Sequence, residues 1–191
     1  NLTVTATTID TFSYGVFMQG DQGSAAGRNL VVSGCTFQGL SNWSVLANSN
    51  TTITSSLVDN TGSPGITARA PGGTIVITGN TIEGVVEQGI LAGGNTTDGR
   101  AESVTVTGNT ITNVTAGNGI LLLDVVDAVI SENIVANIDH AYFRDPGNPG
   151  ADGSITNGYG IACFRAQNCA YSGNDISNVE FASAVIVGAG C

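Results

Sequence analysis

A six-residue stretch in the second half of the chain holds the densest group of side chains that could do acid–base chemistry. It contains His140, Tyr142, Arg144 and Asp145, and His140 is the only histidine present. His140 and Tyr142 could act as base and acid, with Arg144 neutralising a nearby carboxylate, because removing a proton beside a carboxylate requires its charge to be masked. In the alternative, which we favour, Tyr142 packs onto the fold and Arg144 pairs with Asp145.

A second group of side chains could hold a metal ion. Asp98, Glu102, Asp124 and Asp127 lie near corresponding turns of a repeating pattern, so stacking of the repeats could bring their carboxylates together. Ca²⁺ is the ion that such a set of oxygen ligands would suit. The alternative is that they are solubilising charges, of which any repeat protein needs about one per turn. Calcium is the only cofactor that the sequence suggests.

Four cysteines suggest one disulfide. Cys169 and Cys191 lie about one repeat apart near the end of the chain, so stacking could bring them within bonding distance, and Cys163 with Cys169 is the competing pair. Cys35 falls in an inward column of the repeat and is expected to be a free buried thiol. A catalytic thiol is disfavoured, because the single histidine lies in a remote loop.

The composition narrows the class of partner and the compartment. Charged residues make up only 10% of the 191 residues, there are five arginines and no lysine, and the formal charge is −10. This charge disfavours nucleic acid and anionic membranes as partners, and no apolar run is long enough for a membrane span. Together with the cysteines, the acidic and lysine-free composition favours a secreted, extracellular or cell-surface protein.

Five sequons add to the expectation of an extracellular protein. They could accept glycans if the host glycosylates asparagine, although a sequence rich in threonine and asparagine also generates such triplets by chance. Their asparagines are Asn1, Asn42, Asn50, Asn95 and Asn113.

An internal repeat organises the whole chain and must position all of these residues. The motif is a short alternating strand, then Gly-Asn-x-Ile, then Gly-Ile. Its clearest copies begin at Val76 and Val104, and weaker copies centre on Val4, Val32, Ile53, Ile130 and Tyr171. The shortest spacing between copies is 21 to 24 residues, and longer spacings carry insertions near 20–28, 93–102 and 139–158. We therefore expect one domain over 1–191, built as a solenoid of about seven coils.

Three columns of aliphatic residues recur in register and are predicted to point inward, as doubly covered parallel sheets require. The first column is Val4, Val32, Ile53, Ile77, Val106, Ile130 and Tyr171. The second is Ile9, Phe37, Val58, Ile82, Ile111, Val135 and Ile176. The third is Val16, Val45, Ile66, Ile90, Ile120, Ile161 and Val185.

Two corner positions also recur. After the first strand the column ends in four asparagines, Asn80, Asn109, Asn133 and Asn174, and predicts a ladder of side-chain amides that bond from coil to coil. Before the third strand a glycine recurs, at Gly15, Gly65, Gly89, Gly119 and Gly160, which predicts a positive φ or a position with no room for a side chain.

The copies with Val-x-Val-x-Gly-Asn-x-Ile followed by Gly-Ile resemble the repeats of the pectate-lyase-like superfamily. The resemblance covers nearly the whole chain and implies an all-β fold, a right-handed parallel β-helix. The superfamily includes polysaccharide lyases, uronate epimerases, tailspikes, adhesins and surface filaments, so the resemblance is specific for fold and weak for function. The chain departs from the enzymes, since it has no lysine, no Asp-Asp pair and no Asp-Pro-His-Glu motif: Asp145-Pro146 continues into Gly147-Asn148.

Three functional hypotheses follow. Neither end shows a capping element, so we expect self-association or neighbouring chain segments at the ends, and a structural module of a filament, fibre or adhesin stalk ranks first. A carbohydrate-active or carbohydrate-binding β-helix, lyase-like or epimerase-like if it is an enzyme, ranks second. Binding to ice or a crystal surface through outward Thr and Ser columns, such as the one from Thr5 to Ser172, is the minor alternative.

Overall fold

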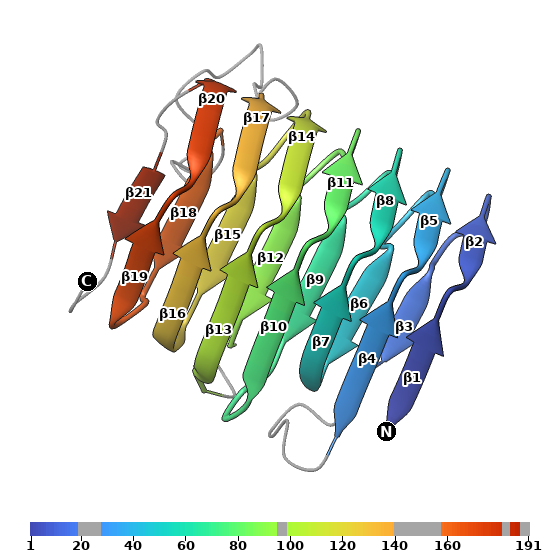
Figure 1. Ribbon diagram of the computed structural model, residues 1–191, viewed down its shortest axis with the longest axis horizontal. Helices are drawn as coiled ribbons and strands as arrows, with labels where there is room; N and C mark the ends of the chain where they lie inside the picture. The colour runs from blue at the N-terminus through green and yellow to red at the C-terminus, as the bar shows by residue number, and fades with distance from the viewer. Residues whose placement is uncertain (19–27, 95–98, 140–157, 181–183, 188–191) are drawn as a thin grey trace, which may run out of the picture.

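The chain folds into three parallel sheets that wind around one hydrophobic column. The structure is a computed structural model, and it describes residues 1–18, 28–94, 99–139, 158–180 and the backbone of 184–187. Each sheet has seven strands, and successive strands along the chain belong to successive sheets. Figure 1 shows this order as the colour gradient running across each sheet from the N-terminal to the C-terminal coil. The molecule is a parallel β-helix of seven coils.

The three sheets take every third strand. Sheet A contains β1 (Leu2–Thr5), β4 (Asn29–Ser33), β7 (Asn50–Thr54), β10 (Thr74–Thr78), β13 (Ala101–Thr107), β16 (Val125–Ser131) and β19 (Cys169–Ser172). Sheet B contains β2 (Thr8–Asp10), β5 (Thr36–Gln38), β8 (Leu57–Asp59), β11 (Thr81–Glu83), β14 (Thr110–Val114), β17 (Ile134–Ile138) and β20 (Asp175–Val179). Sheet C contains β3 (Val16–Met18), β6 (Val45–Asn48), β9 (Ile66–Arg69), β12 (Ile90–Gly93), β15 (Ile120–Leu123), β18 (Ile161–Phe164) and β21 (Ala184–Val187).

The predicted inward columns are confirmed in sheets A and B. Val4 pairs with Val32 and Ile9 with Phe37, and each column continues in register through all seven strands. In sheet C one member is wrong, because Ile161 pairs with Ala184 and Val185 lies one residue farther along. The columns of the five middle coils are fully buried, which gives one continuous core.

The predicted asparagine ladder is confirmed at the corner between sheets A and B. The Oδ1 atom of Asn109 accepts from both the backbone N and the Nδ2 of Asn80, each at 3.0 Å. Asn133 and Asn174 repeat this arrangement in the next two coils. Each Nδ2 also donates to a strand carbonyl of the preceding coil, as from Asn109 to Ile77 at 3.0 Å. The ladder thus satisfies backbone groups that the bend would leave unpaired.

The glycine column before sheet C does not need a positive φ. None of its members adopts one, and the reason for glycine there is space. A Cβ on Gly119 would lie 2.3 Å from Val135 Cγ1 and 2.6 Å from the Gly160 carbonyl oxygen. The left-handed conformation instead occurs one residue before the asparagine ladder, at Ala6, Gly34, Ser55, Gly79, Gly108, Glu132 and Gly173.

Each of the three predicted insertions lies between a strand of one sheet and the next strand along the chain, which belongs to another sheet. They separate β3 from β4, β12 from β13 and β17 from β18. In the described part of the chain there is no helix, so no described helix is long and apolar enough to cross a membrane.

Candidate functional site

The whole predicted acid–base group lies outside the residues that the structure describes. His140, Tyr142, Arg144 and Asp145 all belong to 140–157, so their arrangement stays a prediction.

The predicted calcium ligands are not brought together among the described residues. Asp98 lies outside them, Asp127 accepts a hydrogen bond from Asn168 Nδ2 at 2.9 Å, and Asp124 forms an ion pair with an arginine. Within the described ranges no three His, Cys, Asp or Glu side chains are grouped so as to hold a metal ion. Glu102 and Asp127 therefore do not belong to a metal-binding group among the described residues.

The cysteine predictions have different outcomes. Cys35 is a free, buried thiol, as predicted. No disulfide joins two of the described cysteines, so the pairing of Cys163 with Cys169 is wrong: Cys163 lies in sheet C and Cys169 in sheet A. The pairing of Cys169 with Cys191 stays a prediction, since Cys191 is not among the described residues.

A group of charged residues lies at the corner where sheet C leads into sheet A. Asp124 follows β15 and Arg165 follows β18, at equivalent positions of adjacent coils. The Arg165 guanidinium binds the carboxylate in a bidentate manner, with Nε to Oδ1 at 2.6 Å and Nη2 to Oδ2 at 2.8 Å. Both residues adopt a positive φ of 54°, which turns the chain sharply and places one side chain beside the other.

The backbone around Asp124 holds this corner in place. Its carbonyl oxygen accepts from Gly94 N at 3.2 Å and from Ala101 N at 2.9 Å, and its own N–H donates to the Phe164 carbonyl. These bonds tie three coils together. Two further arginines lie near this corner: Arg69, two coils before Asp124, whose Nη1 donates to the Gly94 carbonyl at 2.9 Å, and Arg100, which directly precedes Ala101. We call Arg69, Arg100, Asp124 and Arg165 the arginine cluster.

The electrostatics of the arginine cluster favour a bound anion. The hydrogen bond from Arg165 lowers the pKa of Asp124, burial opposes that shift, and the charges of Arg165, Arg100 and Arg69 lower the pKa further. Asp124 is therefore ionised at neutral pH, and among the described residues three guanidinium groups act on this one carboxylate. The Asp124 side chain is 9% exposed and that of Arg165 53%, so the negative charge is buried and positive charge faces solvent.

Sheet C also carries apolar side chains on its outer face. Leu91, Leu121 and Ala162 stack in register and form a second hydrophobic cluster with Leu123, Tyr159 and Phe164. In the first two coils the outer face is aromatic and open. There Tyr14, Phe17, Trp43 and Leu46 line a hollow of about 500 Å³.

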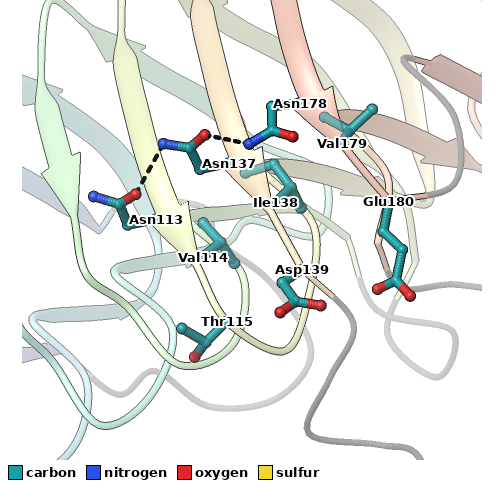
Figure 2. Close-up of a pocket in the computed structure, with 9 residues that line it drawn as sticks. All are labelled: Asn113, Val114, Thr115, Asn137, Ile138, Asp139, Asn178, Val179 and Glu180. Atoms are coloured by element: carbon teal, nitrogen blue, oxygen red, sulfur yellow. Dashed lines mark hydrogen bonds between the residues drawn. The ribbon is translucent and has the colours of Figure 1, made fainter.

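A polar groove lies at the corner that follows sheet B. Asn178 Nδ2 donates to Asn137 Oδ1 at 2.7 Å, and Asn137 Nδ2 donates to Asn113 Oδ1 at 3.0 Å. Figure 2 shows these three asparagines in a row across adjacent strands, with Thr115, Asp139 and Glu180 along the groove. The groove measures about 410 Å³, and its described lining has two acidic and no basic side chains. It suits an anionic ligand less well than the arginine cluster does.

The remaining candidates are placed on the surface without forming a site. The predicted hydroxyl column from Thr5 to Ser172 lies in register on the outer face of sheet A. Among the sequons, Asn50 and Asn113 hydrogen-bond to other side chains, Asn50 Nδ2 to Asn29 Oδ1 and Asn113 Nδ2 to Glu83 Oε1. Glycosylation of any of the five stays a prediction, and Asn95 lies outside the described residues.

The sequence analysis identified Asp124 but not its arginines. Asp124 and Arg165 are 41 residues apart, and so are Ile120 and Ile161 in the third inward column. Aligning the coils on that column and reading four residues farther would have placed Arg165 directly beside Asp124. The signal was therefore present, but it lay in the register between coils and not in any local motif.

Comparison with known proteins supports the fold and gives no family by sequence. No protein-family model matches the chain, and no curated protein matches it either. Among solved structures it is similar to the Azotobacter vinelandii mannuronan C-5 epimerase AlgE4 A-module, with a TM-score of 0.57 and 16% sequence identity. The match covers 100% of this chain and 56% of that one, so the chain spans little more than half of its structural neighbour. The likeness thus supports the parallel β-helix fold of the chain.

Proposed function

We propose that this β-helix binds an acidic polysaccharide, with the arginine cluster holding carboxylate groups of the polymer. The observation that carries the proposal is the excess of guanidinium charge at one corner of a protein whose formal charge is −10. Arginine binds carboxylates through paired N–H groups in a fixed plane, which makes it the residue of choice for such recognition. Three of the five arginines in the sequence gather at this corner.

The arrangement of the cluster suits a ligand better than it suits stability alone. An ion pair that served only the fold would match one arginine to Asp124. Here Arg165 already donates to both carboxylate oxygens of Asp124. Arg69 and Arg100 add positive charge, and no second carboxylate is among the groups that act on Asp124. The similar structure is named as an epimerase of mannuronan, and uronate polymers carry one carboxylate per sugar. This likeness supports the ligand class.

The proposal is limited to binding. An epimerase or lyase step needs a base that removes the proton beside the carboxylate and an acid on the other face of the sugar. The residues predicted for these roles, His140 and Tyr142, lie outside the described residues. Because acidic polysaccharides of this kind occur outside cells, we expect the protein to be secreted or displayed on a cell surface.

The test is titration calorimetry with polymannuronate, polygalacturonate and neutral dextran. Arg165→Ala and Arg100→Ala should each weaken uronate binding about tenfold, since a charge-assisted hydrogen bond contributes roughly 1.5–3 kcal/mol. Arg28→Ala is the matched control, because Arg28 is not among the charges that act on Asp124. Binding should also weaken with added salt. Equal binding of dextran, or equal loss in all three variants, would refute the proposal.

A second candidate function is a structural role in an assembly of chains. Its support is the difference between the first coil and the next: Val4 and Ile9 are only partly buried, whereas Val32 and Phe37 are 0% exposed. Another layer on β1, β2 and β3 would bury these side chains, whether it came from the same polypeptide or from another chain. Size-exclusion chromatography and electron microscopy of the isolated chain test this candidate, and a stable monomer at high concentration would contradict it.

A further inference from the structure

We infer that the hollow formed by Tyr14, Phe17, Trp43 and Leu46 is a second subsite, which stacks a sugar ring of the same polysaccharide. We call these four residues the aromatic platform. The inference rests on the proposed function, and it adds to it a contact with the sugar ring itself, remote from the carboxylate site.

The geometry of the aromatic platform suits a pyranose ring. Tyr14 and Trp43 are stacked, with ring centroids 5.7 Å apart and an angle of 23° between their planes, and Phe17 is tilted beside Tyr14 at 6.3 Å. Tyr14 is 47% and Phe17 51% exposed, so ring surface is open to solvent. A pyranose has apolar C–H faces and a rim of hydroxyls. Tyrosine and tryptophan match it, since each has an apolar ring and a polar hydrogen-bonding group.

The aromatic platform and Arg69 of the arginine cluster lie on the same outer face. Phe17, Leu46 and Thr67 occupy equivalent positions of β3, β6 and β9. Arg69 follows Thr67 by two residues and so projects from the same side of the sheet. Phe17 is two coils from Arg69 and five from Arg165, about 10 Å and about 24 Å along the axis at the usual strand spacing. A polymer lying across the first three coils of sheet C can therefore reach the platform and Arg69.

The aromatic platform fits a polysaccharide better than it fits a lipid or the apolar surface of another protein. The platform is small and rigid, and it is fixed by backbone bonds between coils, such as Gly15 N to the Trp43 carbonyl at 3.1 Å. Its neighbouring site is cationic, which matches a polymer with sugar rings and carboxylates in regular alternation.

The chain provides its own reporter for this subsite. Trp43 is the only tryptophan in the sequence, so tryptophan emission, excited selectively over that of the four tyrosines, reports on the platform alone. We expect a mannuronate hexasaccharide to change the Trp43 emission on binding, while the monosaccharide mannuronate, too short to span both sites, changes it little. Tyr14→Ala and Phe17→Ala should each weaken hexasaccharide binding by about threefold to tenfold, the size of one aromatic contact. Binding of the monosaccharide should be unchanged in both variants.

Phe12→Ala is the matched control, because Phe12 is an aromatic residue of the same coil, is 66% exposed and does not line the hollow. The hexasaccharide could bind in calorimetry while the Trp43 emission stays unchanged and Tyr14→Ala keeps its affinity. That result would overturn the inference and leave the proposed function standing. Loss of the fluorescence change in Phe12→Ala as well would also overturn it. No calorimetric binding of any uronate would overturn both. A concentration-dependent dimer that the platform variants abolish would assign the hollow to a second copy and overturn the inference.

Discussion

Two corners of each coil show opposite uses of polar side chains. At the corner between sheets A and B, Asn80, Asn109 and Asn133 are at most 1% exposed, and their amides bond to one another and to strand carbonyls. At the corner between sheets C and A, Asp124 is buried beneath arginines of which Arg165 is half-exposed. The first corner uses all of its donors inside the fold, and the second keeps charge directed at solvent.

This difference separates structure from function. A buried polar group that is fully bonded stabilises one conformation, and removing its partner leaves orphaned groups that cost free energy. Exposed guanidinium groups in excess of their carboxylates contribute little to stability. They do provide donors for a ligand. Substitutions at the A–B corner should therefore affect unfolding, and substitutions of the arginines at the C–A corner should affect binding.

The largest effect on stability is expected for Asn109→Ala. This change removes the acceptor of the Asn80 backbone N–H and the donor to the Ile77 carbonyl, both in the buried corner. With two or more orphaned groups, we expect the free energy of unfolding to fall by about 2–4 kcal/mol, measured by urea denaturation. Binding of polymannuronate to the protein that remains folded should be unchanged. A loss below about 0.5 kcal/mol would mean that the ladder is not a main source of stability.

A smaller and pH-dependent effect is expected for Asp124→Asn. The folded-state pKa of Asp124 is lowered from its ordinary value of 3.8, chiefly by the hydrogen bond from Arg165, so ionisation of Asp124 favours the folded state. That contribution is fully present above the ordinary pKa and is lost as the pH falls through the lowered value. At pH 7 the variant should be less stable by about 1 kcal/mol, because Arg165 is half-exposed and its bond is screened.

The gap between wild type and Asp124→Asn should then close as the pH falls from the ordinary pKa of 3.8 through the lowered folded-state pKa, below which wild-type Asp124 is protonated. Thermal unfolding of both proteins between pH 2 and pH 8 measures this. A difference that stays constant down to the lowest pH would show that the ionised carboxylate is not the source of the stability.

The sequence predicted the A–B corner better than the C–A corner, and the reason is physical. Three of the four ladder asparagines, Asn80, Asn109 and Asn174, directly follow a glycine inside the repeat, so local spacing identifies them. The arginine cluster is contributed by residues far apart in sequence, from Arg69 to Arg165, and three long insertions alter the spacing between coils. The one misplaced core residue, Val185, lies in the run Ala184-Val185-Ile186-Val187, where no alternation of polar and apolar residues fixes the register.

The smallest effect is expected at the exposed asparagine stack, which tests whether burial or mere stacking gives the ladder its value. Asn137 bonds to Asn113 and Asn178 much as Asn109 bonds to its neighbours, but these side chains are exposed and the residue has a φ of 58°. Glycine occupies the equivalent position of other coils, at Gly39 and Gly84, also with a positive φ. Asn137→Gly should therefore change the free energy of unfolding by no more than about 0.5 kcal/mol, because water replaces the lost bonds and glycine suits the backbone. Urea denaturation beside Asn109→Ala makes the comparison direct. Equal losses in the two variants would show that stacking between coils matters and burial does not.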